Sequence, residues 1–195
     1  MQMSNNTVNR RSTSAAIYRI AFIGIMAGLS LVLMLVRFPL VPSAGWLEYD
    51  LGDIPILLTA IVAGPIPALF TLLITVLIEM VTISKGGFWG MIMHLLATGS
   101  MILILSAIYR RRPTNKSLIA GLVMAALTLV AVMIPMNLVI TPLFMPGMSA
   151  RDVLPMIVPI LLPFNLMKGL LHGLIVFSLY KATMNSWGKV RKNFS

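Results

Sequence analysis

Long apolar runs separated by short polar stretches dominate the pattern of this chain of 195 residues. The runs lie at residues 17–36, 54–83, 88–109, 118–140 and 154–181. A helix needs about 20 apolar residues to cross the hydrocarbon core of a bilayer. Each run is long enough for this, so the pattern predicts a set of helices embedded in a membrane.

The second run cannot be one continuous helix. Gly64-Pro65-Ile66-Pro67 interrupts it, and a proline removes a backbone donor and clashes with the preceding turn. We therefore expect a short helix of about ten residues, reaching only ~15 Å, followed by a tight turn and a longer helix. The short helix must be sheltered by the protein or lie where the protein is thin. The total becomes six helices, of which the second is short.

Three stretches are expected to be irregular. Residues 37–53 are rich in Pro, Gly, aromatic and acidic residues and predict a loop, and residues 141–152 predict another. The last run has prolines at positions 155, 159 and 163, which predict an irregular first half for that helix.

Composition supports a membrane protein of the all-α class. Hydrophobic residues make up 58% of the chain and charged residues 10%, against roughly 45–50% and 25% in soluble domains. A soluble chain of this length cannot cover its surface with so few polar side chains. There are no cysteines, which excludes disulfides and thiolate metal sites.

The placement of the net charge of +10 predicts the orientation. With six passes and the N-terminus inside, a leader (1–16, partly disordered), the 110–116 turn and a basic tail (182–195) are all cytoplasmic, on either side of one membrane domain (17–181). These regions and the adjoining helix ends hold 11 of the 15 basic residues, as the positive-inside bias requires. A cleaved signal peptide is the alternative for the first run, with a poor cleavage site at 41–44. Nucleic-acid binding is excluded, because no polar face exists to follow phosphates.

Three polar side chains within the apolar runs are candidates for a substrate site. Asn137 lies late in the fifth helix, and Asn165 and Lys168 share a face of the sixth because they are three positions apart. Intramembrane ionisable residues are costly and mark functional sites. The alternatives are a lysine that reaches the outer headgroups or pairs with Glu79 or Asp152, and asparagines that only link helices.

Two outer loops are expected near this pocket. Trp46-Leu47-Glu48-Tyr49-Asp50 offers aromatic faces and backbone donors at its mouth, or an interfacial aromatic anchor. Residues 85–89 form either a flexible lid or a simple hairpin between helices.

Signals for an enzyme are weak. His94 and His172 have no nearby catalytic partners in the sequence and are interpreted as hydrogen-bonded packing residues. A GxxxxGK[ST] phosphate loop is absent from the sequence. An integral membrane transferase remains the alternative from a different functional class. Gly24 and Gly28 permit close approach of another helix, either within the chain or from a partner.

Four blocks of sequence resemble the riboflavin-specific S components, the substrate-binding subunits of energy-coupling factor (ECF) transporters. These blocks are WLEYDLGDIP (46–55), GFWGMIMHLLATG (87–99), MNLVITPL (136–143) and LPFNLMKG (162–169). The resemblance implies a six-helix membrane fold that holds riboflavin near the outer surface. Asn137, Asn165 and Lys168 would bind it, and the backbone of Leu47, Glu48 and Tyr49 would help to close the pocket.

The resemblance also implies partners and a location. The partners would be one transmembrane coupling subunit and two cytoplasmic ATPases, in a bacterial cytoplasmic membrane, with riboflavin as transported substrate and no cofactor. Family members commonly have an alanine pair at four-residue spacing in the first helix for subunit contact. This chain departs from that pattern and offers Gly24, Ala27 and Gly28 in the first helix. FMN or another vitamin is the alternative ligand.

Overall fold

The computed structural model describes residues 2–84, 86–145 and 147–194, and most of them are helical. Within these residues there are seven α-helices: α1 (Gln2–Leu33), α2 (Asp53–Val62), α3 (Pro65–Thr82), α4 (Gly87–Tyr109), α5 (Asn115–Phe144), α6 (Ala150–Val153) and α7 (Leu162–Lys192). Five are long and apolar enough to cross a membrane, and α2 is a shorter apolar helix. The helical membrane class is thus confirmed, while the number of crossings stays a prediction.

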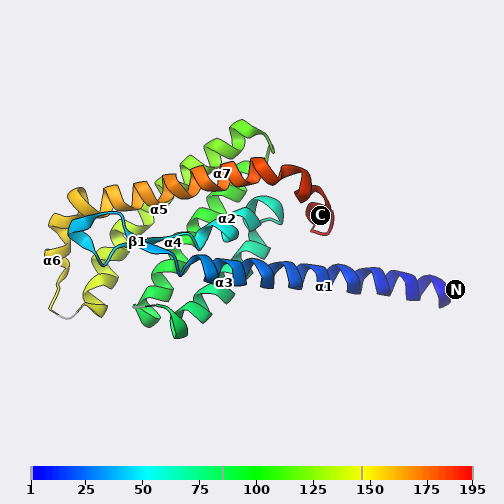
Figure 1. Ribbon diagram of the computed structural model, residues 1–195, viewed down its shortest axis with the longest axis horizontal. Coiled ribbons are helices and arrows are strands. Elements are labelled where there is room, and N and C mark those ends of the chain that lie inside the picture. The colour runs from blue at the N-terminus through cyan, green and yellow to red at the C-terminus, as the bar shows by residue number, and fades with distance from the viewer. Residues whose placement is uncertain (1, 85, 146, 195) are drawn as a thin grey trace.

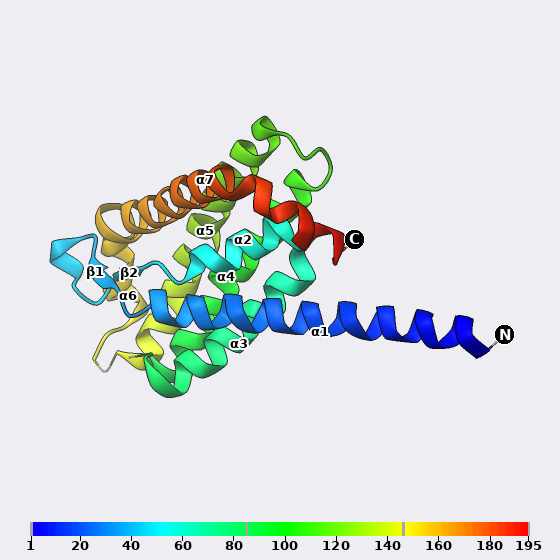
Figure 2. The same cartoon turned by 45° about the vertical axis from the view of Figure 1, so that its right-hand side comes forward.

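Both chain ends lie at one end of the bundle, and the β1–β2 region and α6 lie at the other (Figures 1 and 2). The turn between α4 and α5 lies toward the end with the termini. Helix α1 extends well beyond the bundle toward its N-terminus. This arrangement fits the prediction that both termini share one side of a membrane.

The predicted break between α2 and α3 is confirmed at Gly64. Its φ of 102° lies in a region that residues with a Cβ rarely adopt, and Pro65 then begins α3. Helix α2 has only ten residues, all of them buried. The short helix is therefore sheltered by its neighbours, as its length required.

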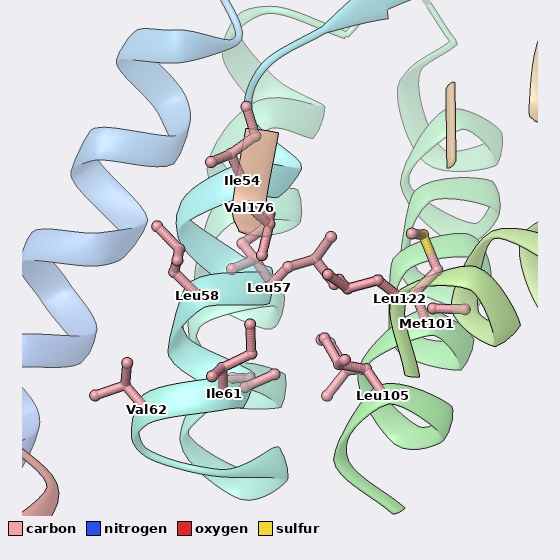
Figure 3. Close-up of a cluster of buried hydrophobic side chains, with 14 of the residues drawn as sticks. Ile54, Leu57, Leu58, Ile61, Val62, Met101, Leu105, Leu122 and Val176 are labelled. Carbon is pink, nitrogen blue, oxygen red and sulfur yellow. The ribbon is translucent and has the colours of Figure 1, made fainter. Parts of the chain in front are cut away.

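Helix α2 forms the centre of the hydrophobic core (Figure 3). Ile54, Leu57 and Ile61 are each at most 5% exposed and belong to one cluster with side chains of the surrounding helices, among them Met101 and Val176. The longer helices surround α2 and expose apolar side chains such as Ile20 and Val81 on their outer faces. A helix that is apolar all round is stable only when it is buried in this way.

Several boundaries differ from the sequence prediction. Helix α1 begins at Gln2, so residues 2–16 continue the helix where a partly disordered leader was expected. Helix α7 likewise continues past residue 181 to Lys192. Helix α5 runs through the start of the expected 141–152 loop to Phe144 and includes Pro142. A proline in a long helix removes only one backbone bond, and tertiary packing can outweigh that loss.

The predicted loop at residues 37–53 contains a small antiparallel hairpin. Strand β1 (Arg37–Pro39) pairs with β2 (Glu48–Asp50), with Phe38 opposite Tyr49. The two rings lie 5.3 Å apart between centroids. A short 3-10 helix, η1 (Pro42–Ala44), lies between the strands. The hairpin was missed because its strands are only three residues long.

The irregular segment before α7 is confirmed. After α6 the chain forms a 3-10 turn, η2 (Leu154–Met156), and a wide π-helical turn, η3 (Ile157–Leu161). The N–H of Leu162 donates to the carbonyl of Ile157, five residues earlier. Proline has no N–H to donate, so the regular i→i+4 pattern is interrupted at these positions. The wider i→i+5 bond lets the helix continue past them.

Candidate functional site

A cavity of about 860 Å³ opens beside the hairpin. Its wall comes from the hairpin, the last turns of α3, the first half of α4, the second half of α5, the α5–α6 loop with α6, and the first turns of α7. The volume lies within the range of roughly 300–1,000 Å³ that is typical of small-molecule sites. Apolar and aromatic side chains on the wall include Trp46, Leu47, Met93, Met133 and Phe164.

The two predicted asparagines meet at this cavity from different helices. Both line it, and both are almost fully buried, Asn137 at 1% and Asn165 at 2% exposure. Each donates one N–H to a carbonyl four residues earlier, Met133 O at 2.8 Å and Leu161 O at 2.7 Å. An amide has two N–H donors and one acceptor oxygen. Each side chain therefore keeps a further donor for a ligand.

Lys168 lines the same cavity, but its ion pairs differ from those considered from the sequence. Its Nζ lies 3.5 Å from Asp53 Oδ2 and 3.9 Å from Asp50 Oδ2. Glu79 and Asp152, the acids considered from the sequence, make their recorded contacts elsewhere: Glu79 with Arg37 and His94, and Asp152 with Ser149. The lysine is thus held inside the protein by acids of the hairpin and of α2.

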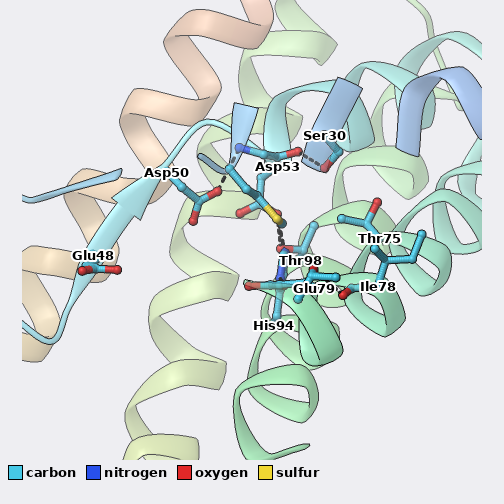
Figure 4. A network of polar contacts seen from close by, with 12 residues as sticks. Ser30, Glu48, Asp50, Asp53, Thr75, Ile78, Glu79, His94 and Thr98 are labelled. Atoms are coloured by element: carbon cyan, nitrogen blue, oxygen red, sulfur yellow. Dashed lines mark hydrogen bonds and ion pairs between the residues drawn. The ribbon is translucent and has the colours of Figure 1, made fainter. Parts of the chain in front are cut away.

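Asp53 is the centre of a buried polar network (Figure 4). It is the first residue of α2 and is only 1% exposed, although the sequence placed it in an outer loop. Thr98 donates to its Oδ1 at 2.6 Å, and His94 Nε2 lies 2.9 Å from the same oxygen. A buried carboxylate needs such partners, because an unpaired charge away from water is very costly.

The network continues from His94 to Glu79, both labelled in Figure 4, and from there through Arg37 to the hairpin. His94 Nδ1 lies 2.7 Å from Glu79 Oε2. Glu79 Oε1 lies 3.5 Å from Nη2 of Arg37, and Arg37 Nη1 lies 3.9 Å from Glu48 on the paired strand. His94 is therefore hydrogen-bonded between helices, as the sequence interpretation had it, and it also lines the cavity, which that interpretation did not include.

His172 does match that interpretation. It is fully buried, and its Nε2 lies 2.9 Å from the carbonyl oxygen of Asp50. A carbonyl only accepts, so Nε2 carries the hydrogen. The His172 ring lies 4.9 Å from the ring of Tyr49 between centroids. His172 thereby fixes the second strand of the hairpin against α7.

The predicted hairpin residues divide into two groups. Leu47 and Glu48 line the cavity together with Trp46. Tyr49 is 1% exposed, is not among the residues that line the cavity, and has no hydrogen-bond partner for its hydroxyl among the described residues. Burial raises the pKa of Tyr49 to about 12. Its side chain packs against Phe38 and His172 and so anchors the hairpin.

The segment 85–89, predicted as a lid or a simple hairpin, reaches the cavity wall at Gly86. Ser84, Gly86 and Gly90 line the wall, whereas Lys85 lies outside the described residues.

The predicted partner-contact residues on α1 also divide. Gly24 and Gly28 are exposed, and a Cβ built on either would meet no atom within 4 Å. Ala27 is 1% exposed and belongs to the interior of the bundle. The two glycines therefore form an open strip on α1, and Ala27 is not part of it.

Sequence reasoning missed Asp53, His94, Glu79 and Arg37 as one network. A usable signal was present: Asp53 directly precedes an apolar run, and His94 and Glu79 lie within two others. Ionisable side chains in or beside apolar runs are costly inside a membrane, so they are expected to pair with one another. The described residues contain no group of three or more side chains suited to hold a metal ion.

Comparison with known proteins gives a consistent result. The profile of the family described as "ECF transporter, substrate-specific component" matches residues 18–180. "Riboflavin transporter RibU" of Staphylococcus aureus (strain TCH60) is 29% identical over 174 residues, which cover 86% of this chain and 90% of that protein. "Riboflavin transporter FmnP" of Bacillus subtilis (strain 168) is 25% identical over 177 residues, 87% of this chain and 93% of that protein.

The fold agrees with these sequence matches. A solved structure described as "Structure and mechanism of the S component of a bacterial ECF transporter" superposes with a TM-score of 0.73 at 28% identity. The superposition covers 86% of this chain and 95% of the other. Since the family profile spans most of the chain, this protein belongs to the substrate-specific components of ECF transporters.

Proposed function

We propose that this chain captures riboflavin for an ECF-type uptake transporter. The observation that carries the proposal is the cavity at the hairpin end, where Asn137, Asn165 and Lys168 come together from two helices. Relatives that match along most of their length are named riboflavin transporters. A transporter component is not an enzyme, so riboflavin is its transported substrate and not a cofactor, and the transferase alternative is set aside.

The chemistry of the wall supports a flavin. A flat ring needs apolar and aromatic surfaces, which Trp46, Phe164 and the methionines offer. Its carbonyls need donors, which the two amides and the ammonium supply, and the hydroxyls of the tail can donate to carboxylates such as Glu48. The backbone of residues 47–49 then covers the ligand from the hairpin side.

The proposed orientation places the cavity at the outer face of a bacterial cytoplasmic membrane and both termini in the cytoplasm. One transmembrane coupling subunit and two ATPases complete the transporter. The open strip at Gly24 and Gly28 on α1 is the proposed contact for the coupling subunit, since it admits the close approach of another helix.

A fluorescence titration of detergent-purified protein tests the ligand. Riboflavin fluorescence should be quenched to saturation at one ligand per chain, without ATP or a partner subunit. Protein purified from flavin-containing cells should be yellow. Competition by FMN measures the preference between the two flavins. Absence of quenching by either flavin would refute the proposed function.

Single substitutions test the site. Lys168→Ala and Asn165→Ala should each weaken binding, the lysine more, because a hydrogen bond that involves a charge contributes about 1.5–3 kcal/mol and a neutral one about 0.5–1.5 kcal/mol. Leu170→Ala is the matched control, since Leu170 lies on the same helix and is 47% exposed. Thermal unfolding of each preparation separates loss of affinity from loss of folding. Unchanged affinity in folded Lys168→Ala would make this lysine structural.

A further inference from the structure

The two oxygens of the Asp53 carboxylate have different partners. Oδ1 accepts from the hydroxyl of Thr98 at 2.6 Å and lies 2.9 Å from His94 Nε2, both on α4. Oδ2 lies 3.5 Å from Lys168 Nζ and 3.6 Å from His172 Nδ1, both on α7. One carboxylate thus connects α2 with two other helices.

The second histidine cannot supply a hydrogen to Oδ2 when its ring is neutral. Its Nε2–H donates to the Asp50 carbonyl, so Nδ1 carries only a lone pair. Nδ1 accordingly has no hydrogen-bond partner among the described residues. Lys168 is then the donor that faces Oδ2. The α4 side fixes one oxygen of Asp53, and this directs the other oxygen toward the lysine.

Asp53 itself does not belong to the cavity wall, whereas Lys168 does. The carboxylate is 1% exposed, and the lysine side chain is 17% exposed. A lysine side chain is flexible and has three equivalent donors. Asp53 lies behind the wall and Asp50 lies on it, so the charge of the ammonium is balanced while its N–H groups can still face the cavity.

We propose that Asp53 is a positioning residue for ligand binding, which orients Lys168 toward the cavity and is itself oriented by Thr98 and His94. The inference rests on the proposed function, because it concerns how the cavity holds its ligand. It also explains why an acid at the start of a membrane-embedded helix is completely buried without contacting the cavity.

A double-mutant cycle on Asp53 and Lys168 tests this role. Asp53→Asn and Lys168→Met should each weaken riboflavin binding by about tenfold or more. If the aspartate acts through the lysine, the double variant should bind no more weakly than the weaker single variant, because the second change has nothing left to remove. Losses that multiply in the double variant would overturn the proposal.

A second pair of variants remains informative if Asp53→Asn fails to fold. Thr98→Val removes the hydrogen bond to Oδ1 at a residue that does not line the cavity, and should weaken binding about three- to tenfold. Thr59→Val is the matched control, since Thr59 is buried on α2 and donates only to the Pro55 carbonyl of its own helix. Equal affinity of the two threonine variants would overturn the proposal.

The same four proteins of the cycle should be unfolded thermally without ligand. Coupling between the two positions in this measurement tests the ion pair independently of any flavin. If wild-type protein binds no riboflavin, the proposed function fails and the positioning role fails with it, whatever the unfolding shows. If wild-type protein binds but the binding losses multiply, only the positioning role fails.

Discussion

Gly169 of α7 lies against Ala126 of α5 so closely that a Cβ built on the glycine would be 2.7 Å from the alanine Cβ and 2.8 Å from its Cα. Real Cβ atoms do not approach other carbons to this distance, so only glycine allows the contact. Gly169 directly follows Lys168, and the contact therefore sets the distance between the two helices at the depth of the candidate site.

Gly169→Ala should destabilise the protein. Alanine is intrinsically better than glycine in a helix by about 0.5–1 kcal/mol, but overpacking costs about 1–3 kcal/mol, and the second effect is larger. Gly173→Ala, one turn later, is the control because its Cβ would meet Leu122 at an ordinary 3.5 Å. It should be neutral or slightly stabilising. Thermal unfolding in detergent measures the stability of both variants. If Gly169→Ala and Gly173→Ala changed the unfolding temperature in the same direction, the packing argument would be contradicted.

Tyr49→Phe should leave stability unchanged or raise it by about 1 kcal/mol. The buried hydroxyl has no partner among the described residues, and an unsatisfied buried hydroxyl is destabilising. The contacts of the ring with Phe38 and His172 are retained. A large loss of stability in this variant would mean that the hydroxyl has an important partner.

The same substitution should change the response to alkaline pH. Burial raises the pKa of Tyr49 from 10.0 to about 12, so the folded protein holds this proton where the unfolded chain releases it. This difference costs the wild-type protein nothing below pH 10 and lowers its stability progressively between pH 10 and 12. The difference in stability between the wild-type protein and Tyr49→Phe should be constant below pH 10 and should grow only between pH 10 and 12.

Cysteine labelling tests the predicted orientation. The chain has no native cysteine, so Arg112→Cys and Ala150→Cys introduce single labels at two exposed positions. In intact cells or right-side-out vesicles, an impermeant maleimide should label position 150 but reach position 112 only after permeabilisation. Both positions avoid Thr114 and Ser149, which cap α5 and α6. The opposite pattern would invert the topology.

Arg37→Gln should speed the release of riboflavin, by roughly tenfold, with a smaller effect on its association. Arg37 connects the hairpin with Glu79 of α3 and also donates to the Met34 carbonyl at 2.7 Å. A hydrogen bond from a charged donor, such as the one from Arg37 Nε to the Met34 carbonyl, contributes about 1.5–3 kcal/mol. Stopped-flow quenching and displacement measure the two rates. Arg151→Gln, at an exposed arginine outside the cavity wall, is the control and should behave as wild type.

The helices were predictable because membrane embedding leaves a local signal. Run length identifies α3, α4 and α5, and Gly64-Pro65 marks the break after α2, since a glycine at positive φ and a proline cannot continue a helix. Irregular backbone around Pro155 and Pro159 follows from the same reasoning. The extensions of α1 and α5 were missed because composition at a helix end does not determine where the last turn stops.

The candidate site was only partly predictable. Asn137, Asn165 and Lys168 were found because polar groups in apolar runs are conspicuous. Partner choice was not predictable: Lys168 lies near Asp53, which is more than 100 residues away in sequence, and no local pattern encodes that pairing. The side-chain direction of Tyr49 was missed for a related reason, because a three-residue strand has too little alternation to identify its buried face.

The wide turn η3 has a consequence for the rotational phase of α7. A π-type turn holds one residue more than an α-turn, and each residue of an α-helix advances the chain by about 100° around its axis. Everything after Leu161 is rotated by that amount relative to an unbroken helix. Deleting a single residue from 157–161 would therefore turn Asn165 and Lys168 away from the cavity with every side chain of α7 intact. The direction in which this helix faces its ligand depends on a residue count upstream as much as on the residues themselves.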